Sequence, residues 1–148
     1  MYKNNWNIDD TIPSAKTEFQ QTIIKHLECI IKFSFNKHKE YIDVLPSKLA
    51  SECMSYFLGV DIRNNFILLD PTINVVIGKE DNDNDLVFIR GDEKYVLEIK
   101  VSKSVATRKV CWRGGELSVR ECDHLLVNWT YDENRNINVY ACIIYLTK

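Results

Sequence analysis

The sequence lacks the features of a secreted or membrane-spanning protein. Its 148 residues contain no apolar run long enough to cross a bilayer, and we expect no signal peptide ahead of Trp6. The five cysteines are odd in number, scattered, and without a Cys-x-x-Cys pair. They are expected to be reduced thiols, not zinc ligands or a disulfide framework. These absences predict a cytoplasmic protein that does not contact a membrane.

Several motifs that would assign a chemistry are also missing. The sequence has no glycine-rich phosphate loop, no nucleophile elbow and no internal repeat. The three histidines, His26, His38 and His124, form no pair with metal-ligand spacing, so each is expected as a surface or capping residue. The length and the ordinary apolar and charged content instead predict one globular domain, residues 1–148, with a substantial core.

The net charge of −2 conceals an uneven distribution. Four acids and no base lie between residues 80 and 85. Six bases against one acid lie between residues 100 and 120: Lys100, Lys103, Arg108, Lys109, Arg113 and Arg120. Acids for a cation beside bases for a phosphate backbone would suit a metal-dependent phosphodiesterase, and two solvated surface runs are the alternative.

The first half of the chain predicts two helices. Residues 1–13 form a polar arm, and Ser14 is the expected N-cap of a helix over 14–36 with an apolar stripe at helical spacing. A second helix is expected to begin at Pro46-Ser47 and to end at Gly59. Strands are then predicted over 66–69 and 73–77, separated by Asp70-Pro71.

The second half predicts mainly strands. A short helix is expected near 117–122, followed by an apolar strand over 124–130. A turn at 132–136 then leads into a last strand over 138–146. The predicted fold class is therefore α/β (α+β).

The most informative stretch is residues 85–101, which predicts a β-hairpin. Strands over 85–89 and 94–101 are joined by the turn 90–93. Pairing Ile89 with Lys94 places Asp85 opposite Glu98, where Cβ atoms lie roughly 5 Å apart. Lys100 projects from the same face two residues further along the strand.

Two facing carboxylates repel each other unless a cation lies between them. A hard divalent ion such as Mg²⁺ is suited to this position because it prefers oxygen ligands. We therefore expect Asp85 and Glu98 to bind Mg²⁺, with Mn²⁺ as a possible substitute. Lys100 could then hold or deprotonate a water, or stabilise a developing negative charge.

This pattern, Asp85 followed by Glu98-x-Lys100 on the adjacent strand, resembles the PD-(D/E)xK nuclease superfamily. Asn84 stands where many members have proline. The resemblance implies a restriction-endonuclease-like αβββαβ core over 47–146, with a mixed central sheet flanked by helices and an extra N-terminal helix. It also implies a further acid on the helix before the first strand, for which Glu52 is preferred and Glu18 is the alternative.

The basic stretch supplies candidate nucleic-acid contacts. Lys103, Arg108, Lys109 and Arg113 could bind phosphates, and the backbone of Gly114-Gly115 could approach one closely. The alternative is a turn ahead of a short helix.

The expected function is that of a Mg²⁺-dependent endonuclease that cuts double-stranded DNA as a homodimer, similar to type II restriction endonucleases. A Holliday-junction resolvase or an RNA endonuclease would use the same residues. A non-catalytic nucleic-acid-binding module is the rival from another class, and an unrelated α/β protein with a chance pattern of charges is a further alternative.

Overall fold

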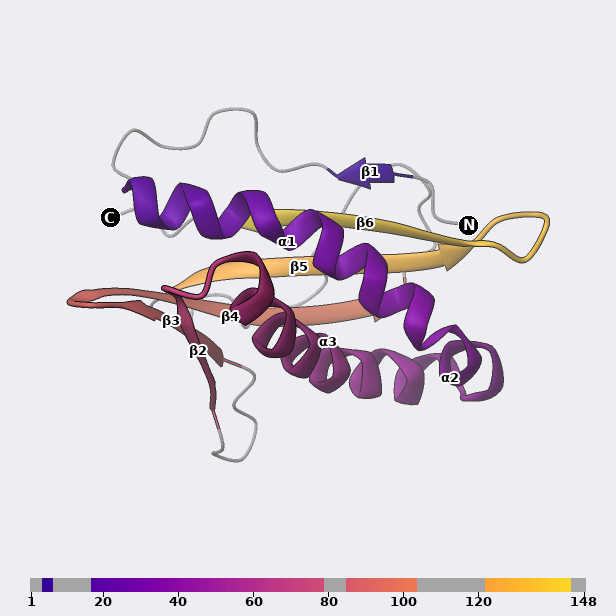
Figure 1. Cartoon of the computed structure of the whole chain (residues 1–148). Helices are drawn as coiled ribbons and strands as arrows, with labels where there is room; N and C mark the ends of the chain where they lie inside the picture. The colour runs from indigo at the N-terminus through magenta and orange to yellow at the C-terminus, as the bar shows by residue number, and fades with distance from the viewer. Residues whose placement is uncertain (1–3, 7–16, 79–84, 104–121, 145–148) are drawn as a thin grey trace.

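The computed structural model describes residues 4–6, 17–78, 85–103 and 122–144 (Figure 1). The fold is mixed α+β. The helices in this part of the chain are α1 (Glu18–Lys37), α2 (Lys39–Val44) and α3 (Ser47–Leu69). The strands are β1 (Asn4–Trp6), β2 (Asn74–Ile77), β3 (Asp85–Arg90), β4 (Glu93–Lys103), β5 (Asp123–Tyr131) and β6 (Ile137–Ile144).

The strands form one mixed sheet in the order β1-β6-β5-β4-β3-β2. The pairs β2–β3, β3–β4 and β5–β6 are antiparallel, whereas β4–β5 and β1–β6 are parallel. The parallel pair β4–β5 lies at the centre of the sheet, so residues from two distant parts of the sequence meet there.

Helices α1 and α3 lie on the same side of the sheet (Figure 1), and we call the side that they cover the helix face. Alternate residues of β4, including Leu97 and Ile99, contribute to the buried core on this face. From α3, the core takes Met54, Leu58, Ile62 and Phe66, each 0% exposed. Residues between these positions on β4 therefore point to the opposite face.

Helix α1 confirms the predicted amphipathic helix but begins later than expected. Its N-cap is Thr17, not Ser14. Thr17 accepts a hydrogen bond from the backbone of Gln20 at 3.2 Å, and its own N–H donates to the Gln20 side chain at 2.9 Å. This reciprocal capping box satisfies two backbone groups, which explains why the helix starts here.

Helix α3 corrects two predictions. It runs through Gly59 to Leu69, so Gly59 does not end it and residues 66–69 are not a strand. A glycine inside a helix costs only about 1 kcal/mol relative to alanine. The apolar stripe buried at every fourth position continues to Phe66 and offsets that cost. The helix ends with Leu69, and its C-cap Asp70 is extended because the residue before Pro71 disfavours the helical conformation.

The remaining strands largely follow the prediction. The strands over 73–77, 124–130 and 138–146 correspond to β2, β5 and β6, and the turn at 132–136 joins an antiparallel pair. The arm is not wholly irregular, because β1 pairs with β6. The predicted loop into Asp85 and most of the short helix at 117–122 lie outside the described residues.

Candidate active site on the opposite face of β4 and β5

The hairpin has the predicted register. Asp85 pairs with Glu98, and Ile89 pairs with Lys94. Pairing continues one step beyond the prediction, to Arg90 and Glu93, so the connecting turn has two residues and not four. Gly91 has φ +60°, which suits the first central position of a type II′ turn.

Glu98 is the buried centre of the candidate site. It lies on the opposite face of β4 and is 1% exposed. Its Oε1 lies 3.3 Å from Nζ of Lys100, the half-buried residue two positions along the same strand. A buried carboxylate needs such partners, because removing it from water is costly unless it is paired.

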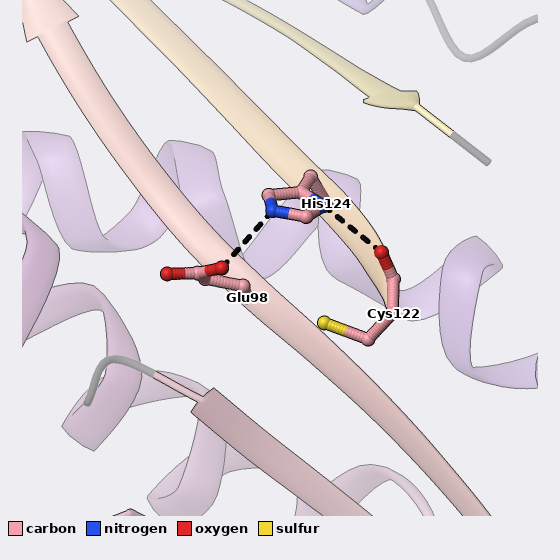
Figure 2. A group of neighbouring side chains, drawn as sticks. All are labelled: Glu98, Cys122 and His124. Atoms are coloured by element: carbon pink, nitrogen blue, oxygen red, sulfur yellow. Dashed lines mark hydrogen bonds and ion pairs between the residues drawn. The ribbon is translucent and has the colours of Figure 1, made fainter. Parts of the chain in front are cut away.

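The second neighbour of Glu98 comes from β5. The parallel register places His124 beside Glu98, and the imidazole Nε2 lies 3.0 Å from Oε2 of Glu98 (Figure 2). The other ring nitrogen, Nδ1, lies 2.9 Å from the carbonyl oxygen of Cys122. Each oxygen of Glu98 therefore has a nitrogen-bearing side chain close to it.

The expectation of a surface or capping role for His124 is wrong, since the residue is 2% exposed. Its alternation with Cys122 on one face could have been noticed in the sequence. The pairing with Glu98 could not, because it depends on the parallel register between β4 and β5. In the described part of the chain, Glu98, Cys122 and His124 offer ligand atoms that all lie within 4.8 Å of one another.

The polar character of this face continues along both strands. Lys100 pairs with Leu126, and Ser102 pairs with Asn128. The buried Asn128 donates from Nδ2 to Oγ of Ser102 at 2.6 Å. The opposite face thus carries a row of polar groups where the helix face carries apolar ones.

Lys103 does not lie with these residues. It belongs to the helix face, where its ammonium group lies 5.4 Å from the ring centroid of Trp129 and 5.6 Å from that of Tyr131. Its Nζ donates to Oγ of Ser47 at 3.3 Å. The structure therefore separates Lys103 from Glu98 and Lys100 by the thickness of the sheet, which gives no geometric support to its predicted role in nucleic-acid binding.

Glu52 on α3 and Glu18 on α1, the two acids considered for an assisting role, also lie away from Glu98. Glu52 is exposed and lines an open hollow whose other side is formed by Val101, Ser102 and Lys103. Ser102 is four residues beyond Glu98, a distance of about 13 Å along a strand. The structure does not bring Glu52 to Glu98, and its assisting role stays a prediction.

Glu18 is engaged at the tip of the hairpin. Its carboxylate lies 2.9 Å from Nη2 of Arg90, and this hydrogen bond lowers the pKa of Glu18 from its ordinary value. Arg90 is five residues beyond Asp85 on β3, about 17 Å along the strand. Glu18 therefore contacts the tip of the hairpin and is not positioned to help a metal at Asp85 and Glu98.

The other predicted nucleic-acid contacts, Arg108, Lys109, Arg113, Gly114 and Gly115, lie outside the described residues. They remain predictions from the sequence. For Asp85, the register fixes the backbone position beside Glu98.

Comparison with known proteins gives no match to any protein-family model, curated protein or solved structure. The helices that the structure describes include none that is both long and apolar enough to span a membrane.

Proposed function

We propose that this chain is a divalent-metal-dependent endonuclease that hydrolyses DNA phosphodiester bonds. The observation that carries the proposal is the position of Asp85 opposite Glu98 on neighbouring strands, with Nζ of Lys100 3.3 Å from the Glu98 carboxylate. Two acids and a lysine on one sheet face suit a metal-activated hydrolysis.

The strand arrangement supports the same proposal. Helix α3 precedes β2, and β2, β3 and β4 are consecutive antiparallel neighbours. The next strand, β5, joins β4 in parallel. This is the order of strands expected for the αβββαβ core of a restriction-endonuclease-like protein, with the connection between β4 and β5 outside the described residues.

Asp85, Glu98 and Lys100 would have separate roles in the proposed hydrolysis. Asp85 and Glu98 would hold the divalent ion, for which the sequence suggests Mg²⁺ or Mn²⁺. When bound, such an ion lowers the pKa of a coordinated water and stabilises charge on the phosphate. Lys100, half-buried beside Glu98, would position the attacking water and stabilise the negative charge that develops.

The proposal is tested by incubating supercoiled plasmid, a four-way junction and single-stranded RNA with the purified chain. Each substrate is tested with Mg²⁺, Mn²⁺ or EDTA. We expect metal-dependent cutting of duplex DNA that is lost in Asp85→Asn, Glu98→Gln and Lys100→Met. Preference for the junction or for RNA would identify a resolvase or an RNA endonuclease on the same site.

A matched control comes from the chain itself. Asp92-Glu93-Lys94 is a second acid-x-lysine sequence, but it lies at the exposed hairpin turn. Lys94→Met should therefore cut like wild type. If wild type cuts no substrate with either metal, or if Lys94→Met loses cutting as fully as Lys100→Met, the proposed site is wrong.

We further propose that double-strand cutting uses a symmetric dimer, since one short chain offers one such site. Light scattering of the purified chain, with and without duplex DNA, measures this directly. A monomer in both conditions that still linearises plasmid in one step would contradict it.

A further inference from the structure

We propose that Glu98, His124 and Cys122 bind a zinc-class transition-metal ion, and that this site prefers such an ion to Mg²⁺. The three side chains come from β4, from β5 and from the residue immediately before β5 (Figure 2). Their ligand atoms all lie within 4.8 Å of one another. The inference rests on the proposed function only for the ion's catalytic role; ion binding is a separate property.

The hydrogen bond at Nδ1 prepares His124 to be a ligand. A carbonyl oxygen can only accept a hydrogen bond, so the 2.9 Å contact with Cys122 requires that Nδ1 carries a proton. In the neutral ring, the lone pair then lies on Nε2, which faces Glu98. Metal-binding histidines commonly donate their other ring N–H to a carbonyl or carboxylate in this way.

The Nε2 atom of His124 is the second observation that indicates a cation. It is buried, it makes no hydrogen bond among the described residues, and the side chain is 3% exposed. It nevertheless lies 3.0 Å from Oε2 of Glu98, so a lone pair and a carboxylate oxygen face each other. Two acceptor atoms can lie this close only with a proton or a metal ion between them.

A metal ion fits the measured separation. Zn²⁺ binds imidazole nitrogen and carboxylate oxygen at about 2.0–2.2 Å, and thiolate sulfur at about 2.3 Å. Two ligand atoms 3.0 Å apart can therefore share one ion. The thiol of Cys122 would lose its proton to solvent on binding.

The donor set decides which ion is preferred. Mg²⁺ favours an all-oxygen shell and keeps several waters, whereas imidazole and thiolate suit zinc and its neighbours in the first transition row. Three protein ligands that leave one position for water are also the arrangement of catalytic zinc sites. Asp85, whose backbone pairs with that of Glu98, lies beside this cluster.

The test is a titration of the full chain, stripped of metal with a chelator, with Co²⁺ as a spectroscopic substitute for Zn²⁺. We expect visible Co²⁺ bands together with a near-ultraviolet thiolate-to-Co²⁺ band, at one ion per chain. Zn²⁺ should displace the Co²⁺, and a large excess of Mg²⁺ should not. Failure of the wild type to bind Co²⁺, or displacement of Co²⁺ by Mg²⁺, would overturn the proposal.

Variants assign the ligands. Cys122→Ser should lose the near-ultraviolet band, and His124→Gln should weaken Co²⁺ binding by about tenfold or more. His26→Gln on α1 and the exposed Cys29→Ser are the matched controls and should bind as wild type does. Because His124 is buried, thermal melting of each metal-free variant reports whether it folds, and the wild-type and Cys122→Ser spectra test the site even if His124→Gln does not fold.

The same variants separate this inference from the proposed function. Normal Mg²⁺-dependent cutting by His124→Gln, together with unchanged Co²⁺ binding, would refute the metal site and leave the nuclease proposal standing. Co²⁺ binding that depends on His124 and Cys122, without cutting of any substrate, would refute the nuclease proposal and support the metal site.

Discussion

Asp61 joins α1 to α3 through a buried polar cluster, and its removal should destabilise the scaffold that carries the site. Its side chain is 3% exposed. The Oδ2 atom accepts a 2.7 Å hydrogen bond from Oγ of Ser34 and lies 3.0 Å from Nε2 of His38. Nζ of Lys37 lies 3.4 Å from Oδ1. Two residues of α1 and its C-cap residue, His38, therefore converge on one carboxylate of α3.

The magnitude follows from these contacts. Hydrogen bonds to a charged group contribute about 1.5–3 kcal/mol each, and a buried polar group left unsatisfied costs about 1–3 kcal/mol. Asp61→Ala removes the acceptor of Ser34, a residue that is 0% exposed. Part of this loss is offset because the buried carboxylate is no longer desolvated. We therefore expect a decrease of about 3 kcal/mol in the free energy of unfolding, or roughly 6–12 °C in Tm.

Urea denaturation followed by circular dichroism measures this change. The exposed turn residue Asp92 supplies the control, because Asp92→Ala should change stability by no more than about 0.5 kcal/mol. Ser34→Ala and the double variant complete a thermodynamic cycle, in which Ser34 and Asp61 should be coupled by about 1 kcal/mol or more. A loss below about 1 kcal/mol for Asp61→Ala, or no coupling, would refute the reasoning.

Three smaller changes test the two sheet faces, the end of β5 and the hairpin turn. Lys103→Met should cost about 0.5–1 kcal/mol of stability, because it loses the cation–π contacts with Trp129 and Tyr131. It should still cleave plasmid, whereas Lys100→Met should not. Equal losses of cleavage in the two variants would contradict this prediction. Burial and a hydrogen bond to Asp43 raise the pKa of Tyr131 to about 12. The folded state therefore favours the neutral phenol. The stability that Tyr131 contributes in this way is complete below pH 10 and should be lost as the pH rises to about 12. A difference in unfolding free energy between wild type and Tyr131→Phe that stays constant over this pH range in urea titrations would exclude this contribution. Gly91→Ala should cost about 1–2 kcal/mol by urea titration, because φ is +60° there; no loss would mean that the turn relaxes.

The register of the hairpin formed by β3 and β4 could be predicted from the local sequence pattern. Alternation along 85–101 set which side chains share a face, and the short connection limited the possible registers, so the pairing of Asp85 with Glu98 was predictable. The exact turn was not, because Arg90 and Glu93 can pair or remain in the loop with little difference in sequence pattern.

Helix α3 shows where local signals compete. Gly59 predicts the end of a helix, and the run of apolar residues from Phe66 to Leu69 predicts a strand. The stripe of Met54, Leu58, Ile62 and Phe66 decided otherwise, because burial against the sheet contributes more than one glycine costs. Tertiary packing therefore set the length of this helix.

The amino-acid sequence by itself determined most of the described helices and strands, though not the length of α3, and the hairpin register that pairs Asp85 with Glu98. These features depend mainly on residues close in the chain. Only the tertiary structure decided that His124 lies beside Glu98 and that Lys103 packs against Trp129. Both contacts depend on the parallel pairing of β4 with β5, strands separated by residues 104–122. No local periodicity specifies which residues meet across so long a connection.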